Sequence, residues 1–124
     1  MSEPLCGVVV AHGSLAEALV RATEAISGVP GVLRAVSNTD CDRGRLETRI
    51  AEAIGPGPAV LFVDLPSGSC LFAALHRYHE DPVVKVVTGV NLAMLVDFVF
   101  HRELSPAAAA ERARDAGTRA IKVP

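Results

Sequence analysis

The stretch that decides the fold is residues 5–14, which read LCGVVVAHGS. Its apolar part is short and rich in valine, which is typical of a strand buried on both faces of a parallel sheet. The strand stops at His12 and Gly13, and Ser14 with Glu17 then matches the Ser-x-x-Glu pattern of a helix capping box. The sequence therefore predicts His12 in the turn between the carboxyl end of a strand and the amino end of a helix.

A histidine in that position has two interpretations. Ligands of open α/β sheets bind beyond the carboxyl ends of the strands, and a helix amino terminus there favours anions. The alternative is a histidine in an ordinary turn. The first interpretation makes His12 a candidate for phosphate chemistry.

Length and composition describe a single α/β domain over residues 1–124. Half of the 124 residues are hydrophobic, and the chain carries 10 glycines and 8 prolines. A chain of this length buries roughly two-thirds of its unfolded surface, which is enough for a core. The formal net charge of -2, the single Tyr and the absence of Trp argue against nucleic acid as a partner.

The cysteines and the N-terminus predict a cytoplasmic protein. Cys6, Cys41 and Cys70 are widely spaced without a C-x-x-C pair, which is typical of reduced thiols in the cytosol. The acidic start at residues 1–4 does not resemble a signal peptide. No apolar run approaches the roughly 20 residues that span a bilayer, so we expect no direct membrane insertion.

Apolar periodicity and turn residues predict an alternation of strands and helices. Gly28 is expected to end the first helix and Asn91 to cap the fourth, whereas Ser105 and Gly117 are expected to cap and end the last helix. After the first strand, helices are expected over 14–27, 43–54, 69–78, 91–101 and 106–116, and strands over 32–37, 59–63, 83–87 and 120–123.

This order predicts a doubly wound α/β fold with a mainly parallel four-stranded sheet, helices on both faces and a short C-terminal strand. The exit loops at 11–13, 64–69 and 88–91 then gather at one edge of the sheet. His12 is thus expected beside Asp64, small hydroxyls and glycines, in a crevice suited to a phosphate.

His12 and Asp64 are the predicted catalytic pair. A carboxylate that accepts from one imidazole N–H fixes the tautomer and leaves the other nitrogen as a nucleophile. Its charge also stabilises the imidazolium-like product of phosphoryl transfer. The alternative role for Asp64 is a helix or turn cap.

The predicted phosphoryl-binding residues are Gly13, Ser14, Ser67, Gly68 and Ser69. The backbone N–H groups of the first two and the hydroxyls of the two later serines can hold phosphoryl oxygens without a full cation. A serine of the second loop could instead cap the helix that follows it.

Other residues give weaker indications of a metal site or of another catalytic function. His76 and His79 have a spacing that can ligate metal, with Glu80 and Asp81 as the nearest further ligands. We interpret these histidines, and His101, as helix-end residues favoured by the helix dipole. The usual nucleotide-binding loops and the hydrolase elbow are absent, and we expect no metal and no cofactor.

Three motifs together resemble the IIA component of the mannose family of the bacterial phosphoenolpyruvate-dependent sugar phosphotransferase system. The first is His-Gly at 12–13 followed by Leu-Ala-Glu-Ala-Leu at 15–19. The second is Asp-Leu-Pro-Ser-Gly-Ser-Cys at 64–70, where the family has Asp, two variable residues and Gly-Gly-Ser-Pro. The third is Thr-Gly-Val-Asn-Leu-Ala-Met-Leu at 88–95, where the family has proline in place of alanine. The resemblance covers nearly the whole chain.

The resemblance implies a cytoplasmic phosphocarrier, a component of a phosphotransferase. The small carrier HPr would pass a phosphoryl group to His12, and a separate IIB component would take it on towards a sugar. Asp64 would be the histidine-orienting carboxylate, and Ser69 the phosphate-contacting serine. The family is usually a homodimer whose C-terminal strand pairs with the partner's sheet, and residues 120–123 could be that swapped strand.

Departures from the family pattern leave other hypotheses open. Ser67 stands at the first loop glycine, where it is expected to alter the loop geometry, and Cys70 and Ala93 replace prolines. Cys70 would invite oxidation if the helix start favoured its thiolate. The alternative function is a regulatory or binding module outside transport. A dihydroxyacetone phosphotransferase subunit is disfavoured, because the loop reads Ala-His-Gly where that subfamily resembles Ser-His-Ser.

Overall fold

The computed structural model describes residues 4–124, so the acidic start at residues 1–3 lies outside the described residues. Its centre is a parallel four-stranded sheet in the order β2-β1-β3-β4. The strands are β1 (Cys6–Ala11), β2 (Leu33–Ser37), β3 (Ala59–Val63) and β4 (Val84–Thr88), and the helices are α1 (Leu15–Ser27), α2 (Arg43–Ile54), α3 (Ser69–Tyr78), α4 (Leu92–Val99) and α5 (Pro106–Arg119). The predicted doubly wound fold is confirmed.

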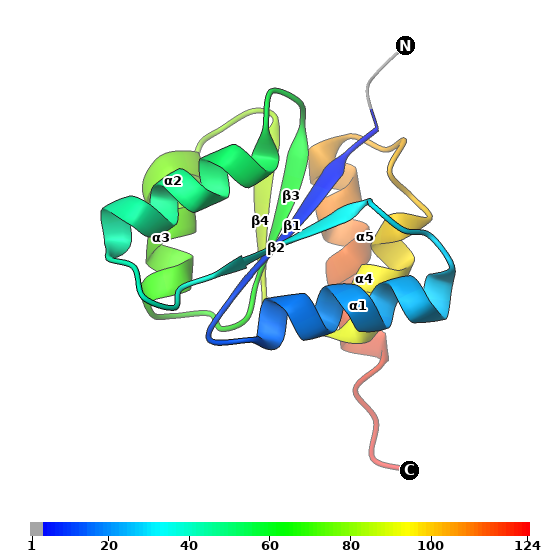
Figure 1. Ribbon diagram of the computed structural model, residues 1–124. Helices are drawn as coiled ribbons and strands as arrows, with labels where there is room; N and C mark the ends of the chain where they lie inside the picture. The colour runs from blue at the N-terminus through cyan, green and yellow to red at the C-terminus, as the bar shows by residue number, and fades with distance from the viewer. Residues whose placement is uncertain (1–3) are drawn as a thin grey trace.

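Helices cover both faces of the sheet. Figure 1 shows α2 and α3 on one side of the strands and α1, α4 and α5 on the other. Each side has its own hydrophobic cluster, one centred on residues such as Leu46, Ile50 and Leu61, the other on residues such as Phe62 and Phe98. Because the central strands β1 and β3 are buried on both faces, they read as continuous apolar runs rather than alternating ones.

The packing around Gly7 in β1 is close. A Cβ added there would lie 2.6 Å from both Leu33 Cδ2 and Phe98 Cε2. The Phe98 ring in turn packs edge-on against Phe62, with ring centroids 5.0 Å apart. Glycine in this strand therefore leaves room for an aromatic pair between the sheet and α4.

Most of the predicted helix ends are confirmed. Gly28 ends α1, and its N–H donates to Glu24 O. Asn91 and Ser105 cap α4 and α5 by accepting from the N–H groups of Met94 and Ala108. The fourth helix ends at Val99 rather than at residue 101.

Two predicted features at helix ends are wrong. Ser14 lies at the N-cap of α1, but its side chain makes no cap hydrogen bond, so the capping box with Glu17 does not form. Gly117 does not end α5, which continues to Arg119. It is buried inside the helix, where a Cβ would lie 2.8 Å from Met94 Cε, so packing against α4 explains this glycine.

The C-terminal segment also differs from the prediction. Residues 120–123 form no strand in this chain, and Ile121 and Val123 are 76% and 99% exposed. The segment leads away from the body of the domain beyond α5 (Figure 1). A segment without a neighbouring strand in its own chain makes no ladder hydrogen bonds and buries no apolar surface. The alternation of apolar and polar residues is therefore not enough to form a strand here.

Candidate active site

The sheet order brings together the ends of β1 and β3. These strands are hydrogen-bonded neighbours, and Val10 pairs with Val63 at their carboxyl ends. The N–H of Asp64 continues the ladder by donating to Val10 O at 3.2 Å. His12 and Asp64, 52 residues apart in sequence, therefore leave the sheet side by side.

His12 and Asp64 make two hydrogen bonds to each other. The backbone N–H of His12 donates to Asp64 Oδ2 at 2.9 Å, and the ring Nδ1 lies 2.7 Å from the same oxygen. The His12 side chain is 46% exposed, whereas that of Asp64 is only 9% exposed. In the neutral ring this places the proton on Nδ1 and leaves the lone pair on Nε2.

The carboxyl of Asp64 is held in its ionised form. Burial on its own raises the pKa of Asp64, but hydrogen bonds from the side chain and backbone of His12, the imidazole charge and the N–H of Leu65 outweigh burial. The pKa of Asp64 consequently lies below its ordinary value. An ionised carboxylate at this position favours positive charge on the ring beside it.

The exit loop of β2 supports the His12 turn, a contribution that the sequence reasoning missed. Gly13 has a φ of 59°, a conformation that glycine adopts readily. Its N–H, predicted to hold a phosphoryl oxygen, instead donates to Asn38 Oδ1 at 3.2 Å, and its carbonyl accepts from Ser37 Oγ at 2.7 Å. Asn38 directly follows a strand beside β1, so the strand-exit rule could have identified it.

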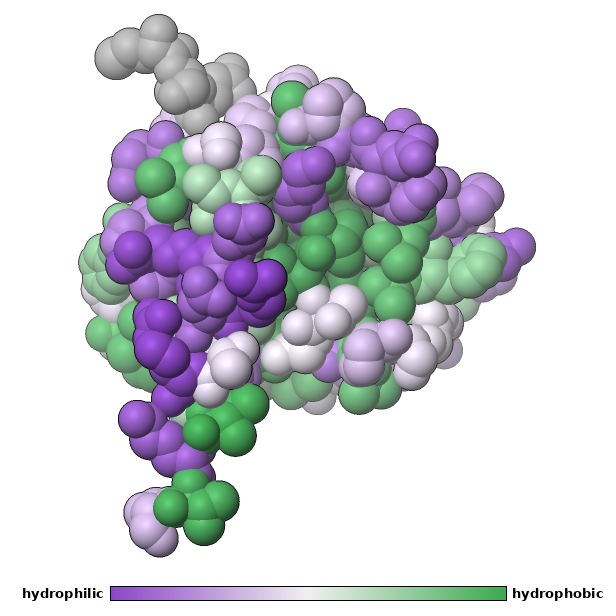
Figure 2. All heavy atoms as spheres, turned by 180° about the vertical axis from the view of Figure 1, so that it is seen from behind, coloured by the Kyte–Doolittle hydropathy of each residue, from purple (hydrophilic) through white to green (hydrophobic). Residues whose placement is uncertain are grey.

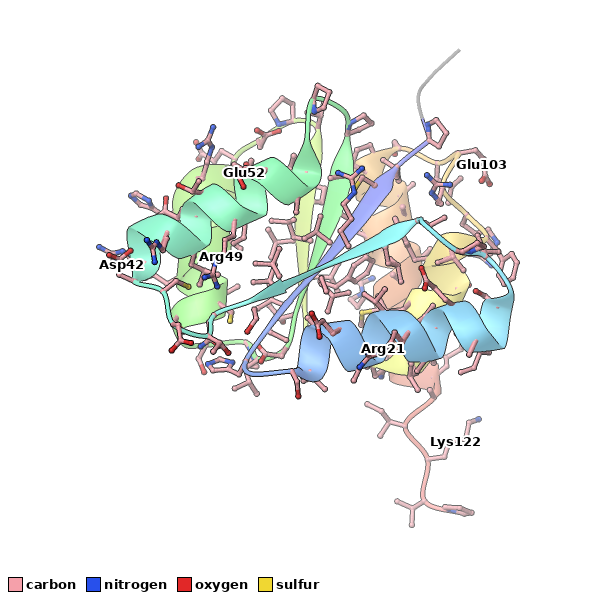
Figure 3. The ribbon with its side chains drawn as sticks, in the orientation of Figure 1. Arg21, Asp42, Arg49, Glu52, Glu103 and Lys122 are labelled. Atoms are coloured by element: carbon pink, nitrogen blue, oxygen red, sulfur yellow. The ribbon has the colours of Figure 1, made fainter. Side chains whose placement is uncertain are left out.

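Arg49 holds that β2 exit loop in place. Its guanidinium Nη1 donates to the carbonyls of Ser37 and Thr39 at 2.8 and 2.9 Å. Figure 3 shows the labelled side chain reaching from α2 toward the end of β2. The turn at Gly13 thus rests on a loop that a neighbouring helix fixes.

The loop after β3 begins α3 without a side-chain cap. Gly68 is the N-cap residue with a φ of 92°, and neither Ser67 nor Ser69 makes a cap hydrogen bond there. Among residues 4–124, Asp40 is the one non-glycine residue with a positive φ, so Ser67 occupies its place without backbone strain. The geometry therefore gives no sign of the disturbance that a serine was expected to cause at the family's glycine position.

Two helices near His12 differ from the other three at their amino ends. In the described part of the chain, the N-cap residue of α1, Ser14, makes no side-chain cap hydrogen bond, and the N-cap residue of α3 is Gly68, which has no side chain. The N-cap residues of α2, α4 and α5 each accept a backbone N–H through their side chains. Uncapped amino ends keep backbone donors available to an anion.

The exit loop of β4 also meets this edge of the sheet. The N–H of Val90 donates to Val63 O at 3.1 Å, beside the start of the Asp64 loop. The Asn91 side chain turns away from the edge, because it caps α4 and donates to Gly117 O at 3.1 Å. This loop therefore contributes to the framework of the site.

Cys70 in the first turn of α3 reaches the imidazole. Its Sγ is 3.8 Å from His12 Nδ1, and the residue is fully buried. Burial, followed by the negative charge of Asp64, raises the pKa of the Cys70 thiol to about 11. The thiol is therefore protonated at neutral pH, and the condition under which Cys70 would invite oxidation, a thiolate favoured by the helix start, is not met.

His76 of α3 and His79, the residue that follows this helix, each lie against a glutamate rather than against each other. His76 Nδ1 lies 2.9 Å from Glu47 Oε1 of α2, and His79 approaches Glu80 instead. Within residues 4–124, the set of ligand atoms close enough to hold a metal comes from His12, Asp64 and Cys70.

An apolar groove begins at the loop before α3. It has a volume of about 510 Å³ and is lined by Gly68, Leu71, Phe72, Leu75, His76 and His79. Phe72 is 50% exposed, and the guanidinium of Arg43 lies 4.4 Å from its ring centroid. The groove and the predicted phosphoryl loop share Gly68, so they are continuous on the surface.

The family described as "EIIA-man: PTS system fructose IIA component" matches residues 7–114 of this chain. This chain belongs to that family. The EIIA-man domain carries His12 and Asp64 inside the matched region, and it is a IIA component of the sugar phosphotransferase system. A search of curated proteins gives no significant match to it.

Solved structures share the fold of this IIA domain at low sequence identity. An EIIA component from Streptococcus agalactiae has a TM-score of 0.86 at 18% identity, covering 96% of each chain. The mannose/sorbose specific IIA subunit from Enterococcus faecalis has a TM-score of 0.82 at 21% identity, covering 98% of this chain and 96% of its own. A protein from Enterococcus faecalis described as a sigma-54 interaction domain protein has a TM-score of 0.76 at 12% identity, covering 97% and 95%.

Over residues 4–124, no helix combines the length and the apolar character that a bilayer crossing requires.

Proposed function

We propose that this IIA domain is a histidine phosphocarrier, which accepts a phosphoryl group from HPr on His12 and passes it to a separate IIB component. The observation that carries this proposal is the contact between His12 Nδ1 and Asp64 Oδ2 at 2.7 Å on a ring that is half exposed. It leaves Nε2 as the nitrogen with a free lone pair.

In the proposed transfer, His12 Nε2 forms a bond to phosphorus while the bond between phosphorus and the donor breaks. The Nδ1 proton stays in the hydrogen bond to Asp64, so the ring becomes positive as the new bond forms. The carboxylate stabilises that positive charge. Transfer to the acceptor reverses these steps, with the acceptor atom forming the new bond to phosphorus.

The proposed phosphoryl ligands come from the two uncapped helix ends. At α1 the candidates are the backbone and hydroxyl of Ser14, and at α3 they are Ser67, Gly68 and Ser69, all of which are exposed. Backbone N–H groups at helix amino ends hold phosphoryl oxygens without a lysine or arginine. Such a moderate hold suits a group that must be passed on.

We place the docking of HPr over the groove that contains Phe72. A donor protein must bring its phosphoryl group to His12 Nε2, so it must cover the surface that continues from the Gly68 loop. That surface offers an exposed aromatic ring beside the guanidinium of Arg43. Aromatic residues and arginine are the types that contribute most to protein interfaces.

We further propose a homodimer in which residues 120–123 add a strand to the partner's sheet. Strand β4 is an open edge of the sheet, and two grooves of about 270 and 290 Å³ follow it past α3 and α5. Figure 2, the view from behind, shows hydrophobic residues gathered in the middle of this face. An unpaired edge strand with free backbone groups is a template for strand addition.

The direct test is phosphorylation of the purified protein with phosphoenolpyruvate, enzyme I and HPr, followed by mass spectrometry at neutral pH. We expect one acid-labile phosphate on wild type and none on His12→Ala. His101→Ala is the matched control, because this imidazole lies just beyond α4 against Asp97 O and lines neither the site nor the groove proposed for HPr, so the variant should still accept phosphate. A phosphate that persists in His12→Ala would refute the assignment.

A regulatory or binding module is the second candidate function. The fold shared with the sigma-54 interaction domain protein favours it, because this fold also occurs outside a sugar-specific subunit. A wild-type protein that takes no phosphate in the assay, yet binds its partner equally well as His12→Ala, would support this function instead.

A further inference from the structure

Three side chains with different ligand atoms meet at the candidate active site. The imidazole of His12, the carboxylate of Asp64 and the thiol of Cys70 place one ligand atom each within 4.8 Å of the others. The proposed phosphotransfer uses the first two and leaves the thiol without a role.

The spacing of these atoms suits a tetrahedral metal ion. Zinc bonds of about 2.0–2.3 Å to N, O and S at tetrahedral angles place ligand atoms roughly 3.3–3.6 Å apart. His12 Nδ1 lies 3.8 Å from Cys70 Sγ and 2.7 Å from Asp64 Oδ2. To bind zinc, His12 Nδ1 and Cys70 Sγ need to move slightly closer together. His12 Nδ1 and Asp64 Oδ2 need to move apart, as occurs when a metal ion replaces the proton between N and O.

The surroundings of the cluster also suit a cation. Within residues 4–124, the hydrogen bonds to the Asp64 carboxylate come from His12 and from the N–H of Leu65, and no lysine or arginine neutralises it. His12 is half exposed, so an ion can enter from solvent and water can take the fourth position. Three protein ligands with one open position is a common zinc arrangement.

We propose that His12, Asp64 and Cys70 form a binding site for a thiophilic divalent cation such as Zn²⁺, and that the bound ion blocks phosphotransfer at His12. The binding stands on the ligand geometry alone. The block rests on the proposed function of His12 as a phosphocarrier.

Metal binding and phosphoryl acceptance exclude each other through the imidazole tautomer. A metal on Nδ1 requires the lone pair there, so the ring proton moves to Nε2 and the nucleophilic lone pair is lost. The Cys70 thiol releases one proton to solvent as the thiolate forms its bond to the metal. Asp64 is then a metal ligand and no longer supports a positive ring. Conversely, a phosphoryl group on Nε2 keeps the proton on Nδ1.

The first experiment measures Zn²⁺ binding to the apo protein by isothermal titration calorimetry, and Co²⁺ binding by absorption spectroscopy. We expect one ion per chain, a thiolate-to-cobalt charge-transfer band, and release of one proton seen as a buffer-dependent enthalpy. Cys70→Ala and Cys70→Ser should each lower the affinity at least about 100-fold, because even outer-shell partners of metal ligands contribute roughly 10- to 100-fold.

Cys6→Ser is the matched control. Cys6 is a thiol at the opposite end of β1 from His12, and its Sγ lies 3.7 Å from Ala53 O. This variant should bind both ions as wild type does. Circular dichroism of each variant establishes that the fold is retained. Absence of binding, or equal binding by wild type and both Cys70 variants, would overturn the metal site.

A second experiment separates this proposal from the proposed function. Zn²⁺ should inhibit phosphorylation of wild type by HPr, and inhibition of Cys70→Ala, measured against its own uninhibited rate, should need at least about 100-fold more Zn²⁺. Binding at the three residues without any phosphorylation of wild type would leave the metal site standing and refute the phosphocarrier. Phosphorylation insensitive to bound Zn²⁺ would refute the block.

Discussion

The substitution Asp64→Asn tests how the carboxylate supports His12. It keeps the shape of the side chain but replaces one carboxylate oxygen by an NH₂ group and removes the negative charge. The wild-type Oδ2 accepts from both the backbone N–H and the ring of His12, while Oδ1 accepts from Leu65. An amide cannot accept on both sides, so one of these bonds is lost.

The contacts at Asp64 set the expected size of the effect. A hydrogen bond to a charged group contributes roughly 1.5–3 kcal/mol, and each 1.4 kcal/mol of barrier corresponds to about tenfold in rate. We expect Asp64→Asn to lower the rate of phosphoryl acceptance by about 10- to 150-fold. An amide NH₂ turned toward Nδ1 would also select the Nε2–H tautomer, which deepens the loss.

The assay is single-turnover phosphorylation by phosphorylated HPr in a quench-flow instrument, with the product counted by mass spectrometry. Asp115→Asn is the matched control, because it makes the same chemical change at an exposed position on α5 and should leave the rate unchanged. An Asp64→Asn protein that folds and transfers as fast as wild type would refute the role of the carboxylate.

The lowered pKa of Asp64 predicts that the stability of the protein depends on pH, and the same variant tests this. The pKa of Asp64 is lowered in the folded protein, so its contribution to stability is present above the unfolded-state pKa of about 4. That contribution is lost as the pH falls through the lower folded value. The difference in Tm between wild type and Asp64→Asn should therefore be larger at pH 7 than in strong acid, and a constant difference would contradict the ionised carboxylate.

Three further predictions concern the core, the docking surface and the tail. Gly7→Ala forces a methyl group within 2.6 Å of Leu33 and Phe98, so urea unfolding should show a loss of about 1–3 kcal/mol. Phe72→Ala should raise the KM for phosphorylated HPr roughly tenfold with kcat unchanged, and an unchanged KM would exclude this groove. Deleting residues 120–124 should convert the proposed dimer to a monomer in sedimentation velocity, and an unchanged sedimentation coefficient would refute the strand exchange.

The order of the first four strands and the five helices, and the meeting of His12 and Asp64 at one edge of the sheet, could be predicted from the sequence because both depend on local patterns. A valine-rich run ending at His12 and another ending at Asp64 identify buried parallel strands, whose side chains leave the sheet at the same edge. Asn91 and Ser105 were predictable caps, because capping depends on residues within one turn.

What depends on packing between distant segments was decided only by the tertiary structure. Gly117 looks like a helix end in sequence, but it lies inside α5. The residue is a glycine there because Met94 of α4 leaves no room for a side chain. The contacts of Asn38 with Gly13 and of Cys70 with His12 join residues from different loops, and the raised pKa of Cys70 follows from its burial there. Sequence pattern determines which residues reach the edge of the sheet, whereas the folded chain determines which atoms touch and what charge they carry.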